Sequence, residues 1–290
     1  MYMFVANMTD FEGMSNRYTQ VKDCKVYSGK IVKQMTFTMK GDKHPNLATA
    51  KVRLLNSGDY NEDLMHWDVT IHGANPREPS NEITVNFYAP NLNNKGVFWT
   101  DSNGLKMVRR QLNHRESFQQ QTPQKTSANF FPVTSALAIV DPESMLEMLV
   151  MNDRSMAGSV LRSGRVELLV NRRVDGDDQR GVYEHLVENN NANKPLHVHS
   201  EFGVHIFNKR HERSLQRQYQ VGRDEPLVVF YASTFRQDKA MIANRNLPRF
   251  LGQELINKLG MGSPAMKFFL MPLDAKMLTI RLENLEDMFD

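Results

Sequence analysis

Apolar and polar side chains alternate along much of the first half of the chain. Met35, Phe37 and Met39 are spaced by two residues, and the same spacing recurs within residues 50–54, 65–71 and 83–87. A period of two is that of a β-strand with one buried face. Clusters of Gly, Asp, Asn and Pro separate these segments every ~8–15 residues, as turns do in all-β proteins. The pattern predicts an all-β sandwich or barrel.

Further apolar segments continue the strand pattern to the end of the chain, at residues 130–133, 146–150, 166–170, 196–206, 227–231, 267–270 and 278–282. We place a domain boundary in the Asn-rich segment 188–194, which precedes Pro195. Residues 1–194 would then form a large β-domain, and residues 195–290 a smaller one. One helix is expected at residues 249–259, on a leucine stripe with i, i+4, i+8 spacing.

Composition excludes several classes of protein. The 36 Lys and Arg residues are nearly balanced by 33 Asp and Glu residues, and the net charge of +3 gives no sign of nucleic-acid binding. The longest apolar runs, such as residues 227–231, have the length of a strand and are too short to span a membrane. A single cysteine, Cys24, excludes an internal disulfide and a cysteine-rich metal site.

Three histidines alternate along one expected strand, at His197, His199 and His205. Residues at i and i+2 share a face of a strand, so His197 and His199 could both ligate one ion. Glu201 is the only nearby carboxylate in the sequence that could join them. A polar strand face explains the pattern with fewer requirements, and we therefore assign no metal ligand to this chain.

The most densely charged segment is residues 172–181, RRVDGDDQRG, which follows the alternating segment 166–170. A strand therefore delivers Arg172 and Arg173 to one edge of a sheet, and Gly176 with its neighbouring aspartates forms a tight turn. These aspartates could hold the arginines in charge-assisted pairs that only fix the loop. They could equally aim one arginine at a polar ligand, and the spacing leaves both interpretations open.

Several motifs resemble those of the class II α-mannosidases, glycoside hydrolase family 38. Residues 98–104, FWTDSNG, resemble the FYTDSNG of that family, and residues 172–181 resemble its RRLxxDDxRG. Three further segments are similar in the same order along the chain: NFFPV at 129–133, DRSMAGS at 153–159 and LTIRLEN at 278–284. Trp99, Phe130 and Phe131 replace tyrosines of the family, which removes hydroxyl donors and keeps aromatic packing.

The resemblance implies a fold for this chain and places the catalytic groups in another part of the enzyme. In the family this region is a large mutarotase-like β-sandwich, or supersandwich, followed by a smaller β-sandwich. The zinc ligands, the nucleophile and the acid/base carboxylate belong to an N-terminal α/β domain, which is followed by a helical bundle, and both precede this region. The resemblance therefore implies that zinc is held in that catalytic portion, which would be the partner of this chain. No catalytic residue is assigned here.

By the same resemblance, two residues of this chain contribute to the sugar-binding pocket: Tyr2 and Arg180. The residues expected to hold the arginine in place are those of the charged segment: Arg172, Arg173, Asp177 and Asp178. The function implied is that of the C-terminal β portion of a retaining α-mannosidase, which hydrolyses α-linked mannose of glycans in the lysosome, vacuole or secretory pathway. The alternative is a non-catalytic β-sandwich module with a structural or carbohydrate-binding role.

Overall fold

The computed structural model describes residues 2–5, 14–41, 45–56, 64–72, 80–101, 106–115, 126–174, 189, 194–208, 220, 223, 266–272 and 277–284. Of residues 2–5, 14–18, 80, 81, 174, 266–272, 278, 283 and 284 it describes the backbone alone. The chain forms two compact units, Met1–Glu212 and Arg213–Asp290. No helix in the described ranges is long and apolar enough to cross a membrane.

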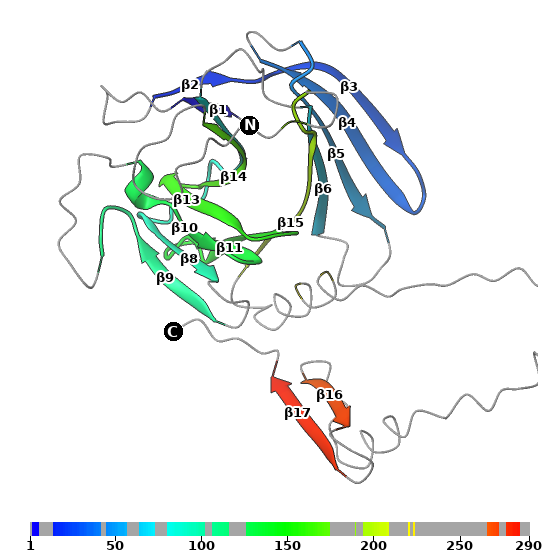
Figure 1. Ribbon diagram of the computed structural model, residues 1–290, viewed down its shortest axis with the longest axis vertical. Coiled ribbons are helices and arrows are strands. Elements are labelled where there is room, and N and C mark those ends of the chain that lie inside the picture. The colour runs from blue at the N-terminus through cyan, green and yellow to red at the C-terminus, as the bar shows by residue number, and fades with distance from the viewer. Residues whose placement is uncertain are drawn as a thin grey trace, which may run out of the picture. The chain divides into compact units, whose positions relative to one another are not determined.

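The larger sheet of the first unit has nine antiparallel strands (Figure 1). Their spatial order is β3 (Gln20–Ser28), β4 (Val32–Lys40), β5 (Ala48–Leu55), β6 (Leu64–Ile71), β15 (Val198–Asn208), β12 (Leu146–Asn152), β11 (Ala136–Val140), β8 (Val97–Asp101) and β9 (Met107–Gln111). Neighbours along the chain pair directly from β3 to β6, as in a β-meander.

The smaller sheet of the same unit has six antiparallel strands. Their order is β10 (Phe131–Val133), β13 (Met156–Arg162), β14 (Arg165–Val174), β7 (Ser80–Tyr88), β1 (Tyr2–Val5) and β2 (Met14–Tyr18). A 3₁₀ turn, η1 (Ser127–Asn129), leads into β10.

The apolar faces of the two sheets form one core. The ring of Phe87, on the six-stranded sheet, packs edge to face on Trp67 and Phe202 of the nine-stranded sheet. The distances between ring centroids are 5.6 Å to Trp67 and 5.5 Å to Phe202. Ile83 and Leu168 are fully buried in the same cluster. Burial of alternate residues from both sheets is the packing of a β-sandwich. The predicted fold class, mainly β with a large sandwich, is confirmed.

The division between the two units lies beyond the boundary expected at residue 194. β15 pairs with β6 on one side and β12 on the other, so it lies inside the nine-stranded sheet. Its Phe202 and Val204 belong to the sandwich core. The Asn-rich segment before Pro195 therefore connects two strands of one unit. A turn-rich segment predicts a break in secondary structure, and only strand pairing shows whether a domain ends there.

In the second unit the described strands are β16 (Met266–Pro272) and β17 (Leu278–Asn284), which form an antiparallel pair. They confirm the strands expected at residues 267–270 and 278–282. The strand expected at 227–231 and the helix expected at 249–259 lie outside the described residues.

At the β3–β4 end of the nine-stranded sheet, apolar side chains on the core-facing side become exposed to solvent. Along β4 the exposed fraction rises from 7% at Met39 to 39% at Met35. On β3, Val21 and Val26 pair with these two methionines and are 60% and 66% exposed. We call the exposed side chains of Val21, Val26 and Met35 the β3–β4 strip. An apolar strip on an edge strand is a surface that folded proteins ordinarily cover.

Candidate functional site

The arginine-bearing end of β14 lies beside the start of β7. Arg172 pairs with Glu82 in the strand register, and its Nε lies 2.8 Å from Glu82 Oε1. The Arg172 side chain is 54% exposed, whereas the Glu82 side chain is 22% exposed. Burial raises the pKa of Glu82 above its ordinary value of 4.5, and the charge of Arg172 offsets part of that rise. The pair thus joins a half-buried acid to a solvent-facing cation.

Arg173 lies on the opposite face of β14 from Arg172, because successive residues of a strand alternate between faces. It is 7% exposed and pairs in register with Asn81. The predicted partners of the two arginines, Asp177 and Asp178, lie outside the described residues, as does Arg180. Their roles stay predictions. The structure gives Arg172 a carboxylate that the sequence reasoning missed, Glu82, from a strand about 90 residues earlier.

Tyr2 lies in β1, which pairs with β7 on the side away from β14. In register, Phe4 lies opposite Glu82, and Glu82 lies opposite Arg172. Tyr2 lies opposite Thr84, two residues farther along β7. With strands about 4.8 Å apart, the Tyr2 backbone and the arginine-bearing end of β14 are separated by roughly 10–12 Å. The fold therefore places Tyr2 and residues 172–174, the described start of the charged segment, in one sheet.

The described part of the FWTDSNG segment, residues 98–101, lies in contrast within the fold and contributes to its packing. Asp101 is 1% exposed, and its carboxylate accepts hydrogen bonds from the backbone amides of Ser135 (2.9 Å) and Ala136 (2.8 Å). It also accepts one from the Ser135 hydroxyl at 2.5 Å. A buried carboxylate with several donors is held in place and has little capacity left for a ligand. This part of the motif connects β8 to the start of β11.

The NFFPV and DRSMAGS segments meet in the same region. The Ser159 hydroxyl donates to the backbone oxygen of Asn129 at 2.8 Å, and the Asn129 side chain bonds Asn113. Phe131 packs edge to face on Phe98, with the guanidinium carbon of Arg115 4.0 Å from its ring centroid. Three of the motifs that carry the resemblance, at residues 98–101, 129–133 and 153–159, therefore meet in one network within the fold, which explains their spacing as a requirement of folding.

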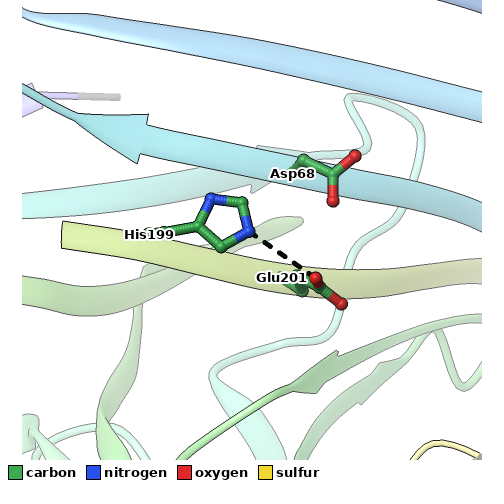
Figure 2. A group of neighbouring side chains, drawn as sticks. All are labelled: Asp68, His199 and Glu201. Atoms are coloured by element: carbon green, nitrogen blue, oxygen red, sulfur yellow. Dashed lines mark ion pairs between the residues drawn. The ribbon is translucent and has the colours of Figure 1, made fainter.

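Two side chains of β15, His199 and Glu201, lie beside Asp68 of β6 (Figure 2). Glu201 of β15 lies directly opposite Asp68 of β6 in register, and His199 lies opposite Thr70. One nitrogen or oxygen from each of His199, Glu201 and Asp68 lies within 4.8 Å of the other two. His199 Nε2 is 3.5 Å from Glu201 Oε1.

The other two histidines do not join this group. His197 has its ring against His72, with the centroids 5.4 Å apart. His205 is 2% exposed and stacks on Phe207. Asp68 was missed by the sequence reasoning because it lies 131 residues before His199, and no local spacing connects them. Strand pairing alone brings them together.

Two packed antiparallel sheets, with a charged arginine end and a separate carboxylate–histidine cluster, define a β-sandwich domain with polar sites on its sheets. The chain belongs to the family described as the glycosyl hydrolases family 38 C-terminal domain, whose model matches residues 3–180, more than half of the chain. This bears out the resemblance drawn from the motifs.

Curated relatives are similar over part of the chain. The lysosomal α-mannosidase of Homo sapiens is 39% identical over 108 residues, which are 37% of this chain and 10% of that protein. The lysosomal α-mannosidase of Dictyostelium discoideum is 34% identical over 104 residues, 36% of this chain and 10% of that protein. The aligned segments thus span about a tenth of these relatives.

A solved structure supports the fold. The crystal structure of an α-mannosidase from Enterococcus faecalis V583 superposes with a TM-score of 0.54 at 13% identity, covering 76% of this chain and 26% of that one. At this level of identity the likeness shows the shared β architecture.

Proposed function

We propose that this chain is the C-terminal β portion of a retaining, zinc-dependent α-mannosidase that hydrolyses α-linked mannose of glycans. The reactive groups would lie in a catalytic portion of the same enzyme, where zinc would bind the sugar hydroxyls. This chain would supply Tyr2 and Arg180 to the sugar pocket. By the names of the animal and Dictyostelium relatives, the compartment would be lysosomal, with the vacuole or secretory pathway as counterparts elsewhere.

The observation that carries this proposal is the neighbourhood of β1 and β14. Two strands about 170 residues apart in sequence, β14 with Arg172 and β1 with Tyr2, lie on either side of β7 in one sheet. A phenol offers one hydrogen bond and an apolar ring face, and a guanidinium offers a fixed fork of donors for hydroxyls or a carboxylate. Together they suit recognition of a hexose.

The need for a partner is supported by the β3–β4 strip. Val21, Val26 and Met35 continue the core-facing side of the nine-stranded sheet, yet they are 39–66% exposed. Covering them with another part of the enzyme would stabilise the assembled state by about 25 cal/mol for each Å² of apolar surface that is buried. The proposed enzyme would cover this strip in the assembled state.

The test uses the complete enzyme, in which this chain is joined to its catalytic portion, and an aryl α-mannoside as substrate. Arg180→Ala is expected to lower kcat/KM by about 10- to 100-fold, the loss of a charged hydrogen bond of roughly 1.5–3 kcal/mol. Tyr2→Phe removes one neutral hydrogen bond and is expected to cost about 2- to 10-fold. The melting temperature of both variants should match that of the wild type.

Arg109→Ala is the matched control, because Arg109 is an exposed arginine on β9 at the far end of the nine-stranded sheet. Its kcat/KM should not change. If Arg180→Ala behaves like Arg109→Ala, the pocket role is refuted and the arginine only supports the loop. The 290-residue chain alone should not turn over the substrate. If the complete enzyme is also inactive on α-mannosides, the alternative of a non-catalytic module is favoured.

A further inference from the structure

We propose that Asp68, His199 and Glu201 form a binding site for a divalent transition-metal ion, Zn²⁺ foremost, on the nine-stranded sheet. The site lies on β6 and β15, whereas the proposed sugar pocket involves β1 and β14 of the other sheet. It revises our expectation that this chain holds no metal ligand. The inference is independent of the proposed enzymatic function.

The separation of the ligand atoms supports the site. His199 Nε2 and Glu201 Oε1 are 3.5 Å apart, longer than a well-formed hydrogen bond. Two ligand atoms held at about 2.0–2.1 Å by one tetrahedral zinc ion lie roughly 3.3–3.4 Å from each other. With all three ligand atoms within 4.8 Å, small rotations of exposed side chains would close the set around one ion. Figure 2 shows the imidazole and both carboxylates gathered over two adjacent strands.

The hydrogen bonding of His199 supports the same role. Its Nδ1 lies 3.1 Å from the Thr70 hydroxyl, and its Nε2 is the nitrogen near Glu201. When Nδ1 carries the proton and donates it to Thr70 Oγ1, the lone pair of Nε2 faces the carboxylates. Metal-binding histidines in proteins are oriented in this way by a partner on their second nitrogen. The Thr70 hydroxyl can accept this hydrogen bond, and Nε2 is then free to ligate.

The charges around the cluster favour a cation on the side of Glu201. Two carboxylates at directly opposed positions of an antiparallel pair repel each other. Asp68 has a counter-charge, because Arg53 Nη2 lies 2.7 Å from Asp68 Oδ2 and Lys51 lies opposite Asp68 on β5. In the described part of the chain, Glu201 forms an ion pair with His199, and it also attracts Arg154, which is itself paired with Asp153. A metal ion would relieve the carboxylate repulsion, in competition with the cations of β5.

The donor set selects the kind of ion. One imidazole nitrogen and two carboxylate oxygens suit Zn²⁺ and, more weakly, Mn²⁺, whereas Ca²⁺ and Mg²⁺ prefer all-oxygen sites with more ligands. Three protein ligands leave the fourth tetrahedral position of zinc to water. His199 and Glu201 are exposed and Asp68 is partly buried, so the site is open to solvent.

The test is isothermal titration calorimetry of the 290-residue chain, stripped of metal, with ZnCl₂ as the probe. We expect one binding event per chain. His199→Gln and Glu201→Gln should each lower the affinity at least tenfold, and Thr70→Val should lower it by about tenfold through the lost orientation of the ring. Arg53→Gln should raise the affinity severalfold, because it removes a competing cation. A purely structural role for these residues predicts no such opposite changes.

His197→Gln is the matched control, since it removes a histidine two positions from His199 that contacts His72. Its zinc affinity should equal that of the wild type. Loss of binding in this variant with retention in His199→Gln would assign the ion to the His72–His197 pair and overturn the proposal, as would no binding by the folded wild type. Imidazole ¹⁵N spectra give a second readout: zinc should shift Nε2 of His199 while Nδ1 stays protonated.

Discussion

Two aspartates of the same sandwich, Asp101 and Asp68, illustrate opposite uses of a carboxylate. Asp101 is 1% exposed and accepts three hydrogen bonds from Ser135 and Ala136. Asp68 lies on a partly open sheet face, where it pairs with Arg53 and faces Glu201. The carboxylate of Asp101 is bonded to groups within the fold, whereas that of Asp68 can still bind a ligand from solvent. Motifs that identify a family can therefore be folding motifs, and sites for ligands must be sought elsewhere.

The largest effect is expected at the buried aspartate. Asp101→Ala would leave two amides and one hydroxyl without their acceptor, and each unsatisfied buried group costs about 1–3 kcal/mol. We expect the free energy of unfolding of the first unit to fall by about 3 kcal/mol or more, measured by urea denaturation. Asp68→Ala is the control, with a change of about 1 kcal/mol, because its partner Arg53 remains accessible to water. Equal losses in the two variants would refute the contrast drawn between them.

A smaller loss is expected at Gly158, in the same buried region. A Cβ at this position would lie 2.6 Å from Val133 Cγ2 and 3.0 Å from methyl groups of both Leu137 and Leu168. Overpacking of this kind costs about 1–3 kcal/mol, which we expect for Gly158→Ala in urea denaturation. Val133→Ala removes the nearest obstacle. The double variant should therefore be less destabilised than the sum of the single variants, and strict additivity would show that Val133 is not the obstacle.

The sequence was sufficient for the strands and for the family. Alternation at residues 35–39, 65–71 and 83–87 located β4, β6 and β7, because one face of each strand meets the core. The motif segments at residues 98–101, 129–133 and 153–159 could be recognised because close contacts fix their residues and spacing. Local patterns of this kind depend only on neighbours along the chain.

Sheet order and long-range pairs could not be read in the same way. The placement of β15 between β6 and β12 decides the extent of the first unit, and its pairing with β6 spans more than 100 residues of sequence. The same pairing brings Asp68 to His199, and the pairing of β7 with β14 brings Glu82 to Arg172. The alternation of histidines predicted a polar strand face. The neighbouring carboxylate, Asp68 on β6, could be identified only from the strand pairing in the structure.

The pair Glu82–Arg172 is intermediate between the two aspartates and gives the smallest expected effect. Burial raises the pKa of Glu82 above 4.5, while the half-exposed Arg172 offsets only part of the rise because solvent screens its charge. Between 4.5 and this higher pKa, the folded state binds a proton that the unfolded state has released. The contribution of Glu82 to stability is therefore greatest below pH 4.5 and decreases as the pH rises through that window.

Arg172→Gln should raise the pKa of Glu82 further, because the one lowering contribution is removed, and it should move the upper end of the window to higher pH. Carbon-detected NMR titration of the Glu82 carboxyl measures the shift directly, and urea denaturation at several pH values measures its consequence. Arg109→Gln, on a distant exposed strand, should leave the titration unchanged. A fall in the Glu82 pKa on removal of Arg172 would show that this carboxylate resembles neither aspartate, and that another group governs its charge.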